Sequence, residues 1–274
     1  MPSFNSIPAN KLVRLVGIPG SPTIIDVRAD RPSHLIPGSI MLGPGDIEAW
    51  SAGFRGSSVV IVDEDGATSA EGIAAWLRTD GAVAEALEGG FAAWQASGLP
   101  LLNSARLPRR DAHGATIWVT RARPKVDRIA CPWLIRRFVD PKARFLFVAA
   151  ADVLAVAREL GATPFDVAHE DVFWSHRGDR CTFDLMVEEL GLGDFLGIDY
   201  LASIVRGADT ARPDLVPEAA GLLALSLGLS RMFADDLVQL DAGMLVYDAL
   251  YRWCRDARGE THDWTSHKPR EVRA

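Results

Sequence analysis

The first part of the chain alternates short apolar runs with amphipathic stretches. Residues 58–62 form a continuous apolar run of mostly β-branched side chains, which is typical of a strand buried in a parallel sheet. Further strands are expected over residues 23–28 and 83–87, and helices over residues 7–17, 46–52 and 70–78. This alternation predicts an α/β domain, with a parallel sheet and helices on both faces, over residues 1–103.

A second alternation begins after a basic, proline-marked linker at residues 104–114. Strands are expected over residues 116–120 and 144–148, with a short one near 165–167, and Asp127 is the expected N-cap of a helix over 128–139. From Phe195 onward the periodicity is helical, with segments expected over residues 195–205, 217–232 and 236–255. The pattern predicts an α-rich α+β domain over residues 115–257, followed by a polar tail at 258–274.

Composition and charge narrow the class of protein. Hydrophobic residues make up 48% of the 274 residues and charged residues 24%, which is ordinary for a soluble protein, and no apolar run is long enough to cross a bilayer. The net charge is −7, yet residues 106–148 carry eleven Lys and Arg against three Asp. Such a basic band between acidic regions favours a focused anion site or an internal docking face over nucleic-acid binding. We therefore expect neither a membrane nor a nucleic acid as partner.

The cysteines indicate the compartment. Only Cys131, Cys181 and Cys254 are present, and no two of them form a CxxC pair. The N-terminal residues show no basic segment followed by an apolar one, so no secretory signal is expected. Both features fit a reducing cytoplasm.

Four segments in the first domain resemble the rhodanese (sulfurtransferase) family. They are Ile-Asp-Val-Arg at 25–28, His-Leu-Ile-Pro-Gly-Ser-Ile at 34–40, the strand at 58–62, and Leu-Glu-Gly-Gly-Phe-Ala-Ala-Trp at 87–94. In active members of that family, the residue after the third segment is a cysteine that carries sulfur as a persulfide. Asp63 stands at this position, and no cysteine precedes Cys131. The resemblance therefore implies a rhodanese-like domain without sulfurtransferase activity.

The loop that begins at Asp63 is acidic, with Glu64 and Asp65 following. Carboxylates at this place would cap and charge-complement the N-terminus of the helix at 70–78, which makes the domain a silent scaffold or docking module. The alternative is that the acidic loop binds a cation or a basic partner, such as the downstream arginine band.

The second domain resembles the C-terminal domain of the chromate-resistance (chromate-sensing regulator) family. The resemblance rests on four motifs in order: Trp-Val-Thr-Arg at 118–121, a run at 127–141, His-Arg-Gly-Asp-Arg-Cys-Thr-Phe-Asp at 176–184 and Ile-Val-Arg-Gly-Ala-Asp-Thr at 204–210. It implies a stress-response role in chromate resistance. In the regulator branch a DNA-binding segment precedes this domain. A rhodanese-like domain stands there instead, which argues against a repressor.

Arginines in these motifs predict an oxyanion site, because a guanidinium matches the oxygens of chromate or sulfate. Arg121, Arg123 and Arg128 flank a strand end and a helix start, and Arg177 and Arg180 flank a glycine turn ahead of another helix. Arg206 could close the pocket. The alternative is a buried network in which these arginines pair with nearby aspartates.

A metal site is the second hypothesis. His176, Asp184 and Glu170 are candidate ligands for zinc or iron, although their spacing matches no standard motif, so no cofactor is certain. Cys181, beside Arg180 at a helix N-terminus, is expected to have a lowered pKa and to act in redox chemistry, or else to be a core residue. An oxyanion, metal or redox sensor, a sulfurtransferase-like or redox enzyme acting through Cys181, and a non-catalytic scaffold stay open. The oligomeric state is not indicated.

Overall fold

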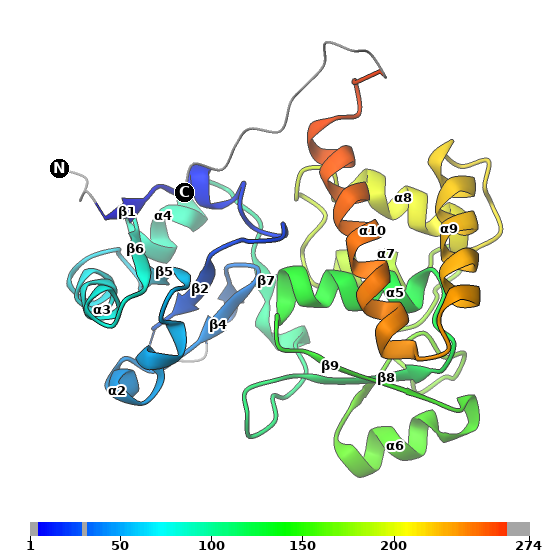
Figure 1. Ribbon diagram of the computed structural model, residues 1–274, viewed down its shortest axis with the longest axis horizontal. Coiled ribbons are helices and arrows are strands. Elements are labelled where there is room, and N and C mark those ends of the chain that lie inside the picture. Colours follow the sequence, from blue (N-terminus) through cyan, green and yellow to red (C-terminus); the bar gives the residue numbers. More distant parts are fainter. Residues whose placement is uncertain (1–4, 29–31, 262–274) are drawn as a thin grey trace.

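The computed structural model describes residues 5–28 and 32–261, which form two lobes (Figure 1). A five-stranded sheet in the order β1-β6-β5-β2-β4 organises the first lobe, and all its neighbouring strands are parallel. The strands are β1 (Ser6–Ile7), β2 (Thr23–Asp26), β4 (Ser39–Met41), β5 (Ser58–Val62) and β6 (Val83–Leu87).

Alternate side chains of the central strands enter different layers. Val59 and Ile61 pack with α3 (Thr68–Thr79) and the region of α2 (Ile47–Trp50). Val60 and Val62 face the opposite side, which α1 (Ala9–Leu12) and α4 (Gly90–Ala96) cover. The predicted α/β architecture with helices on both faces is therefore confirmed.

Two helices of this lobe differ from the prediction. The expected helix over residues 7–17 is wrong, because Ile7 belongs to β1 and the α-helix ends at Leu12. The chain must then turn back toward β2, and Gly17 adopts a φ of +80° against the Phe138 ring, where a Cβ would overlap it. The expected helix over 46–52 is split into α2 with 3₁₀ turns on either side, η1 (Pro44–Asp46) and η2 (Ser51–Phe54).

The second lobe holds a three-stranded parallel sheet in the order β10-β8-β9, with β8 (Ile117–Arg121), β9 (Arg144–Val148) and β10 (Thr163–Pro164). Helix α6 (Val153–Leu160), preceded by a 3₁₀ turn η5 (Ala150–Asp152), covers one face. Helices α5 (Asp127–Leu134) and α7 (Thr182–Glu189) lie on the other. The predicted helical remainder is confirmed as α8 (Ile198–Asp209), α9 (Glu218–Met232) and α10 (Asp236–Asp256), and this lobe is accordingly α-rich.

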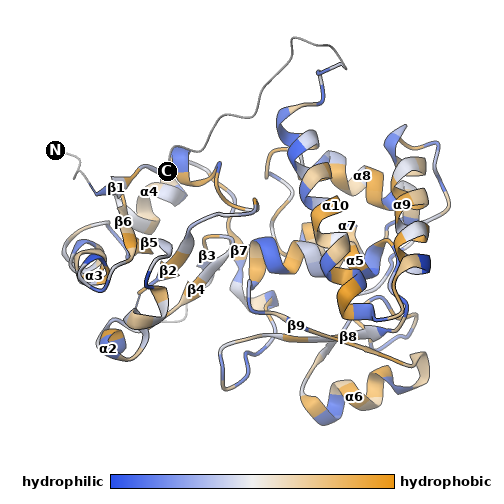
Figure 2. Ribbon diagram, viewed as in Figure 1, coloured by the Kyte–Doolittle hydropathy of each residue, from blue (hydrophilic) through white to orange (hydrophobic). Residues whose placement is uncertain are grey.

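One end of α5 connects the two lobes. The helix continues as a π-helical turn, η4 (Ile135–Val139), which turns the buried Phe138 ring toward Phe195 and Tyr251 at centroid distances of 5.1 and 5.6 Å. The Phe138 carbonyl accepts a hydrogen bond of 2.6 Å from the Gly38 N–H in the first lobe. The largest apolar cluster therefore runs through both lobes, and Figure 2 shows apolar segments facing each other across the seam.

The connection between the lobes is attached at several points. Strand β3 (His34–Leu35) pairs antiparallel with β7 (Leu102–Asn103), and a 3₁₀ turn η3 (Ser104–Arg106) follows. Arg110 then forms an ion pair of 3.0 Å with the buried Asp140. These contacts hold the connecting segment against both sheets.

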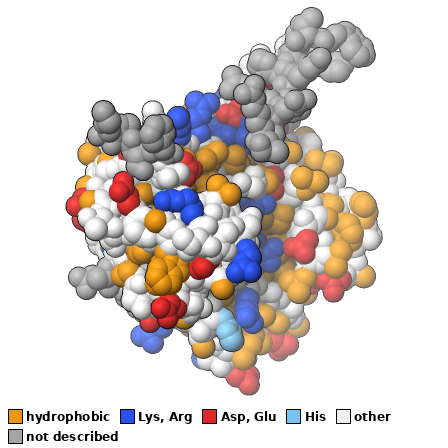
Figure 3. Space-filling model, turned by 60° about the vertical axis from the view of Figure 1, so that its left-hand side comes forward, with side chains coloured by type: hydrophobic (Ala, Val, Ile, Leu, Met, Phe, Trp, Pro, Cys, Tyr) orange, Lys and Arg blue, Asp and Glu red, His pale blue; other side chains and the backbone are white. Residues whose placement is uncertain are grey.

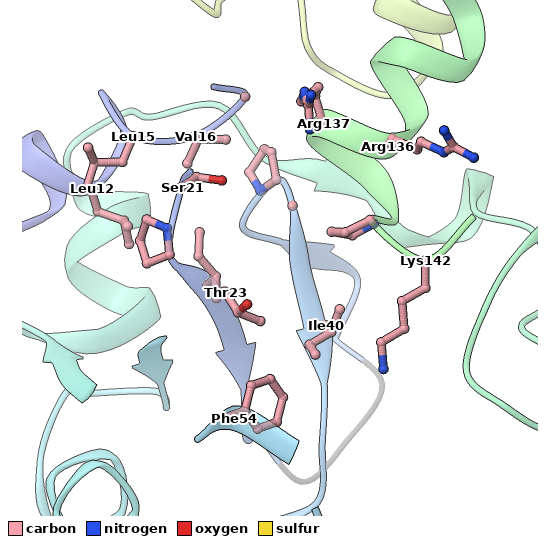
Figure 4. Close-up of a pocket in the computed structure, with 16 residues that line it drawn as sticks. Leu12, Leu15, Val16, Ser21, Thr23, Ile40, Phe54, Arg136, Arg137 and Lys142 are labelled. Atoms are coloured by element: carbon pink, nitrogen blue, oxygen red, sulfur yellow. The ribbon is translucent and has the colours of Figure 1, made fainter. Parts of the chain in front are cut away.

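A cavity of about 190 Å³ opens at this seam (Figure 4). Apolar side chains such as Leu12, Val16 and Ile40 line one side, and Arg136, Arg137 and Lys142 line the other. Figure 3 shows Lys and Arg side chains gathered in a band down the middle of this face. Within residues 5–28 and 32–261, no helix is both long enough and apolar enough to span a membrane.

Candidate metal centre

In the first lobe, the side chain of Asp63 stabilises the loop that follows β5. The Asp63 carboxylate accepts hydrogen bonds from the Gly66 N–H at 2.6 Å and from the Ala70 N–H, in the first turn of α3, at 2.9 Å. Asp63 is buried, so its charge faces backbone donors rather than solvent. The position that would carry sulfur in a rhodanese is thus filled by a side chain that satisfies these donors itself.

We expect Asp63→Ala to lower the free energy of unfolding by about 1–2 kcal/mol, because two backbone donors at the start of α3 lose their acceptor. Urea denaturation monitored by circular dichroism would measure this change. Glu64→Ala, at the exposed neighbouring position, is the control and should change stability little. Equal effects of the two substitutions would contradict the capping role.

In the second lobe, four side chains from separate segments meet in what we term the carboxylate–imidazole centre: Asp127, Asp166, His176 and Asp209. The His176 Nε2 atom lies 3.1 Å from Asp209 Oδ2, 3.4 Å from Asp166 Oδ1 and 3.6 Å from Asp127 Oδ2. Asp127 begins α5, Asp209 ends α8, Asp166 follows β10, and His176 precedes α7. Packing of these elements therefore assembles the centre.

Asp127 is the most buried member. It was predicted to be the N-cap of α5, but Val126 holds that position and the Asp127 side chain turns toward another helix. Its Oδ2 accepts hydrogen bonds from the N–H groups of Thr182 at 2.6 Å and Phe183 at 3.3 Å, at the start of α7. Its Oδ1 is buried and has no hydrogen-bond partner among the described residues.

Asp166 connects the centre to two of the arginines. Its Oδ2 lies 3.2 Å from Arg121 Nη2 and 3.2 Å from Arg128 Nε, and its Oδ1 accepts a hydrogen bond of 3.1 Å from the Thr182 hydroxyl. Arg128 also donates to the carbonyls of Arg121 and Ala122. The two guanidinium groups thus both contact the Asp166 carboxylate.

The environment raises the pKa of Asp127 and of His176 and lowers that of Asp166. Burial raises the pKa of Asp127, and the nearby Asp209 and Asp166 carboxylates raise it further. Burial acts the same way on Asp166, but its hydrogen bond with His176 and the charges of Arg128 and Arg121 outweigh it and lower the pKa. Hydrogen bonds with Asp166 and Asp209 raise the pKa of His176 from 6.5 to about 10. His176 is therefore protonated at neutral pH and neutralises part of the carboxylate charge.

This protonation predicts that the stability of the protein depends on pH. Because the folded pKa of His176 lies above its ordinary value, its stabilising contribution is fully present below pH 6.5 and is lost as pH rises through about 10. The difference in melting temperature between the wild type and His176→Gln, measured with a chelator present, should shrink over that interval. A constant difference across it would show that His176 does not carry the charge.

The arginines of the predicted oxyanion site are only partly brought together. Arg121 and Arg128 flank the carboxylate–imidazole centre. Arg123 instead donates to the Ser230 and Phe233 carbonyls at the end of α9. The others form ion pairs elsewhere: Arg177 with Glu189, Arg180 with Glu188, and Arg206 with Asp184.

The predicted metal ligands are also distributed. His176 lies in the centre, whereas Asp184 accepts a hydrogen bond from the Cys181 N–H at 3.1 Å and pairs with Arg206. Glu170 is exposed on the loop between β10 and α7. A compact group of metal-ligand side chains among the described residues is formed by Asp127, Asp166 and His176.

The prediction of a lowered pKa for Cys181 is wrong. Its side chain is fully buried, so desolvation raises the pKa, and the carboxylates of Asp127 and Asp184 raise it further. Burial likewise raises the pKa of Cys131, on α5. A thiol in such surroundings stays protonated and is a poor nucleophile. Cys254 is buried on α10, as expected of a core residue.

Three comparisons with known proteins bear on this structure. Residues 118–254 match the model of a family described as the ChrB C-terminal domain. Protein ChrB of Cupriavidus metallidurans is 34% identical over 150 residues, which are 54% of this chain and 44% of that protein. The chain therefore spans less than half the length of this relative. The family match confirms the resemblance that the motifs at 118–141, 176–184 and 204–210 predicted.

Solved structures similar to this chain include a rhodanese-related protein from Thermoplasma volcanium, which is 22% identical. The match covers 37% of this chain and 100% of that protein, with a TM-score of 0.33. A thiosulfate sulfurtransferase from Pseudomonas aeruginosa is 19% identical over 54% of this chain and 30% of that one, with a TM-score of 0.32. The fold itself is defined by the parallel strand order described above.

Proposed function

Because the chain belongs to the ChrB C-terminal-domain family, we propose that it is a chromate-stress protein whose second lobe binds and senses a metal cation at the carboxylate–imidazole centre. The observation that carries the proposal is the approach of three carboxylates to one imidazole, with the Asp127 Oδ1 atom buried and without a hydrogen-bond partner in the part of the chain that the structure describes. An unpaired carboxylate oxygen inside a protein is costly unless a cation or proton compensates it.

The donor set favours particular ions. Carboxylate oxygens with one imidazole nitrogen suit Mn²⁺, Fe²⁺ or Zn²⁺, whereas Cu⁺ prefers the thiolates that this centre does not present. In the metal-free protein the protonated His176 and the two arginines balance the carboxylates. A bound divalent cation would offset the negative charge of the carboxylates in place of the proton on His176. His176 would then be neutral and could coordinate the cation.

Calorimetric titration of the chelator-treated protein with Mn²⁺ and with Zn²⁺ tests the proposal. We expect one site per chain, and an affinity at least about tenfold weaker in Asp166→Asn, since even outer-shell partners contribute roughly 10–100-fold. His169→Ala is the matched control, because His169 lies on the same loop and pairs with the exposed Asp171 instead. If the wild type binds neither cation, or if His169→Ala loses as much affinity as Asp166→Asn, the carboxylate–imidazole centre is not the cation site.

An oxyanion is a second ligand that Arg121 and Arg128 favour. In the metal-free protein both guanidinium groups face the Asp166 carboxylate, which repels an anion. Chromate or sulfate would therefore bind beside these arginines only after a cation has offset the carboxylate charge. Titration with chromate in the presence and absence of Zn²⁺ checks this order, and tight binding without the metal would contradict it.

For the first lobe we propose a non-catalytic role, as a scaffold or as a docking module for a protein partner. The Asp63 contacts support this, because the loop donors that would face a persulfide are already paired. The wild type should show no thiosulfate:cyanide sulfur transfer, and a measurable rate would overturn the proposal.

A further inference from the structure

The outer side of helices α9 and α10 presents an apolar face that the rest of the described chain leaves uncovered. The two helices lie side by side in the second lobe (Figure 1). Leu225 on α9 is 53% exposed and Leu245 on α10 is 72% exposed. The groove between them is lined only by apolar residues, namely Leu225, Leu245, Val246, Ala249, Leu250 and Trp253. A contiguous surface of this kind usually marks a site of association.

The exposed stripe of α10 carries a pattern that complements itself. Asp241, Leu245, Ala249 and Arg252 follow one another at steps of four, four and three residues, so they fall on one face of the helix. A negative charge therefore lies at one end, a positive charge at the other, and apolar side chains lie between them. When a second copy of the helix runs antiparallel, Asp241 of each copy comes opposite Arg252 of the other, and Leu245 comes opposite Ala249.

From this pattern we infer that the chain forms a two-fold symmetric dimer through α10, with a second copy of itself as the partner that covers the apolar face. In such an isologous contact each Leu245 enters the groove beside Ala249 of the other copy, as a knob enters a hole. The inference stands apart from the metal centre and does not depend on it.

The charged ends remain available for such a contact. Asp241 pairs with Arg136 at 3.1 Å, yet its side chain is 73% exposed. Arg252 pairs with Asp256 one turn away, also at 3.1 Å, and is 51% exposed. Both can therefore meet a charge from outside without leaving their present positions.

The length of the helix suits the contact. With 21 residues, α10 extends about 30 Å. The exposed Leu237 and Val238 lie on the same helix, on the far side of Asp241 from the apolar groove.

Light scattering coupled to size-exclusion chromatography of the full chain tests the inference, with concentration varied over roughly a hundredfold because dimers dissociate on dilution. The wild type should have the mass of a dimer, and Leu245→Asp that of a monomer. Leu196→Asp is the control, since Leu196 is 69% exposed but lies outside the stripe. A monomeric wild type, or equal disruption by both substitutions, would overturn the inference.

Charge reversal distinguishes this geometry from any other hydrophobic association. Asp241→Lys alone and Arg252→Glu alone should each weaken the dimer, because like charges then face each other across the two-fold axis. The double variant restores opposite charges and should dimerise as the wild type does. Failure of the double variant to recover would exclude the antiparallel pairing of α10.

Discussion

Phe138→Ala is expected to lower the free energy of unfolding by about 3–5 kcal/mol and to loosen the contact between the two lobes. The ring is fully buried and lies edge-on to three aromatic neighbours: Trp133, Phe195 and Tyr251. It also fills the space beside Gly17 in the first lobe. Truncation therefore leaves a cavity whose walls belong to both lobes and cannot easily close.

Urea unfolding of the full chain, monitored by tryptophan fluorescence and by far-ultraviolet circular dichroism, measures this effect. We expect the two probes to separate in the variant, because weakening the seam lets each sheet unfold on its own. Phe173→Ala is the control, since Phe173 is partly exposed and should cost much less. A loss as small as that of the control would mean that Phe138 does not join the lobes.

Three strands were predicted with the right bounds, for a local reason, whereas the short strand expected near 165–167 is wrong, because β10 covers Thr163–Pro164. The strands at 83–87 and 144–148 have the expected bounds, because the turn residues on either side of a short apolar run mark where the strand begins and ends. The helix predicted over 7–17 has the right periodicity, but its length is limited by packing. Gly17 must fit beside Phe138, which is far away in sequence, and the same contact accompanies the π-helical turn at 135–139.

The site was harder to predict, because its members come together only through tertiary packing. Asp166 follows a two-residue strand and Asp209 is the last residue of a helix, so neither position carries a local signal for a ligand. Motif membership was the available clue, since Asp127 and Asp209 stand in the same runs as the arginines. Sequence also could not separate arginines that flank the centre, such as Arg121, from those that pair with a nearby glutamate, such as Arg177.

Cys181 shows why a local rule about pKa can fail. A helix N-terminus and a neighbouring arginine both stabilise a thiolate, and both are present. The Arg180 side chain, however, points to Glu188 at the surface, whereas the sulfur is buried beside the Asp127 carboxylate. Desolvation and negative charge then dominate, and neither is visible in the order of residues along the chain.

Asp127→Asn is expected to stabilise the metal-free protein while it abolishes cation binding. The amide oxygen of asparagine can still accept from the Thr182 N–H, so the start of α7 stays capped. The substitution removes a carboxyl whose pKa is raised first by its burial and further by the nearby Asp209 and Asp166 carboxylates. A carboxyl group with a raised folded pKa costs stability once pH exceeds its ordinary value of 3.8. The melting temperature should therefore rise by roughly 2–4 °C or more at neutral pH, as expected for about 1 kcal/mol in a chain of this size.

Two measurements make this prediction specific. The gain in melting temperature should disappear below pH 3.8, where the wild-type carboxyl is also neutral. Zn²⁺ should raise the melting temperature of the wild type but not that of Asp127→Asn, because the variant lacks the buried anionic ligand. Asp179→Asn, at an exposed aspartate on the loop before α7, is the control and should leave both properties unchanged. A variant less stable than the wild type would mean that the Asp127 carboxylate stabilises the fold. The cost in stability that we attribute to a cation-binding role of Asp127 would then not exist.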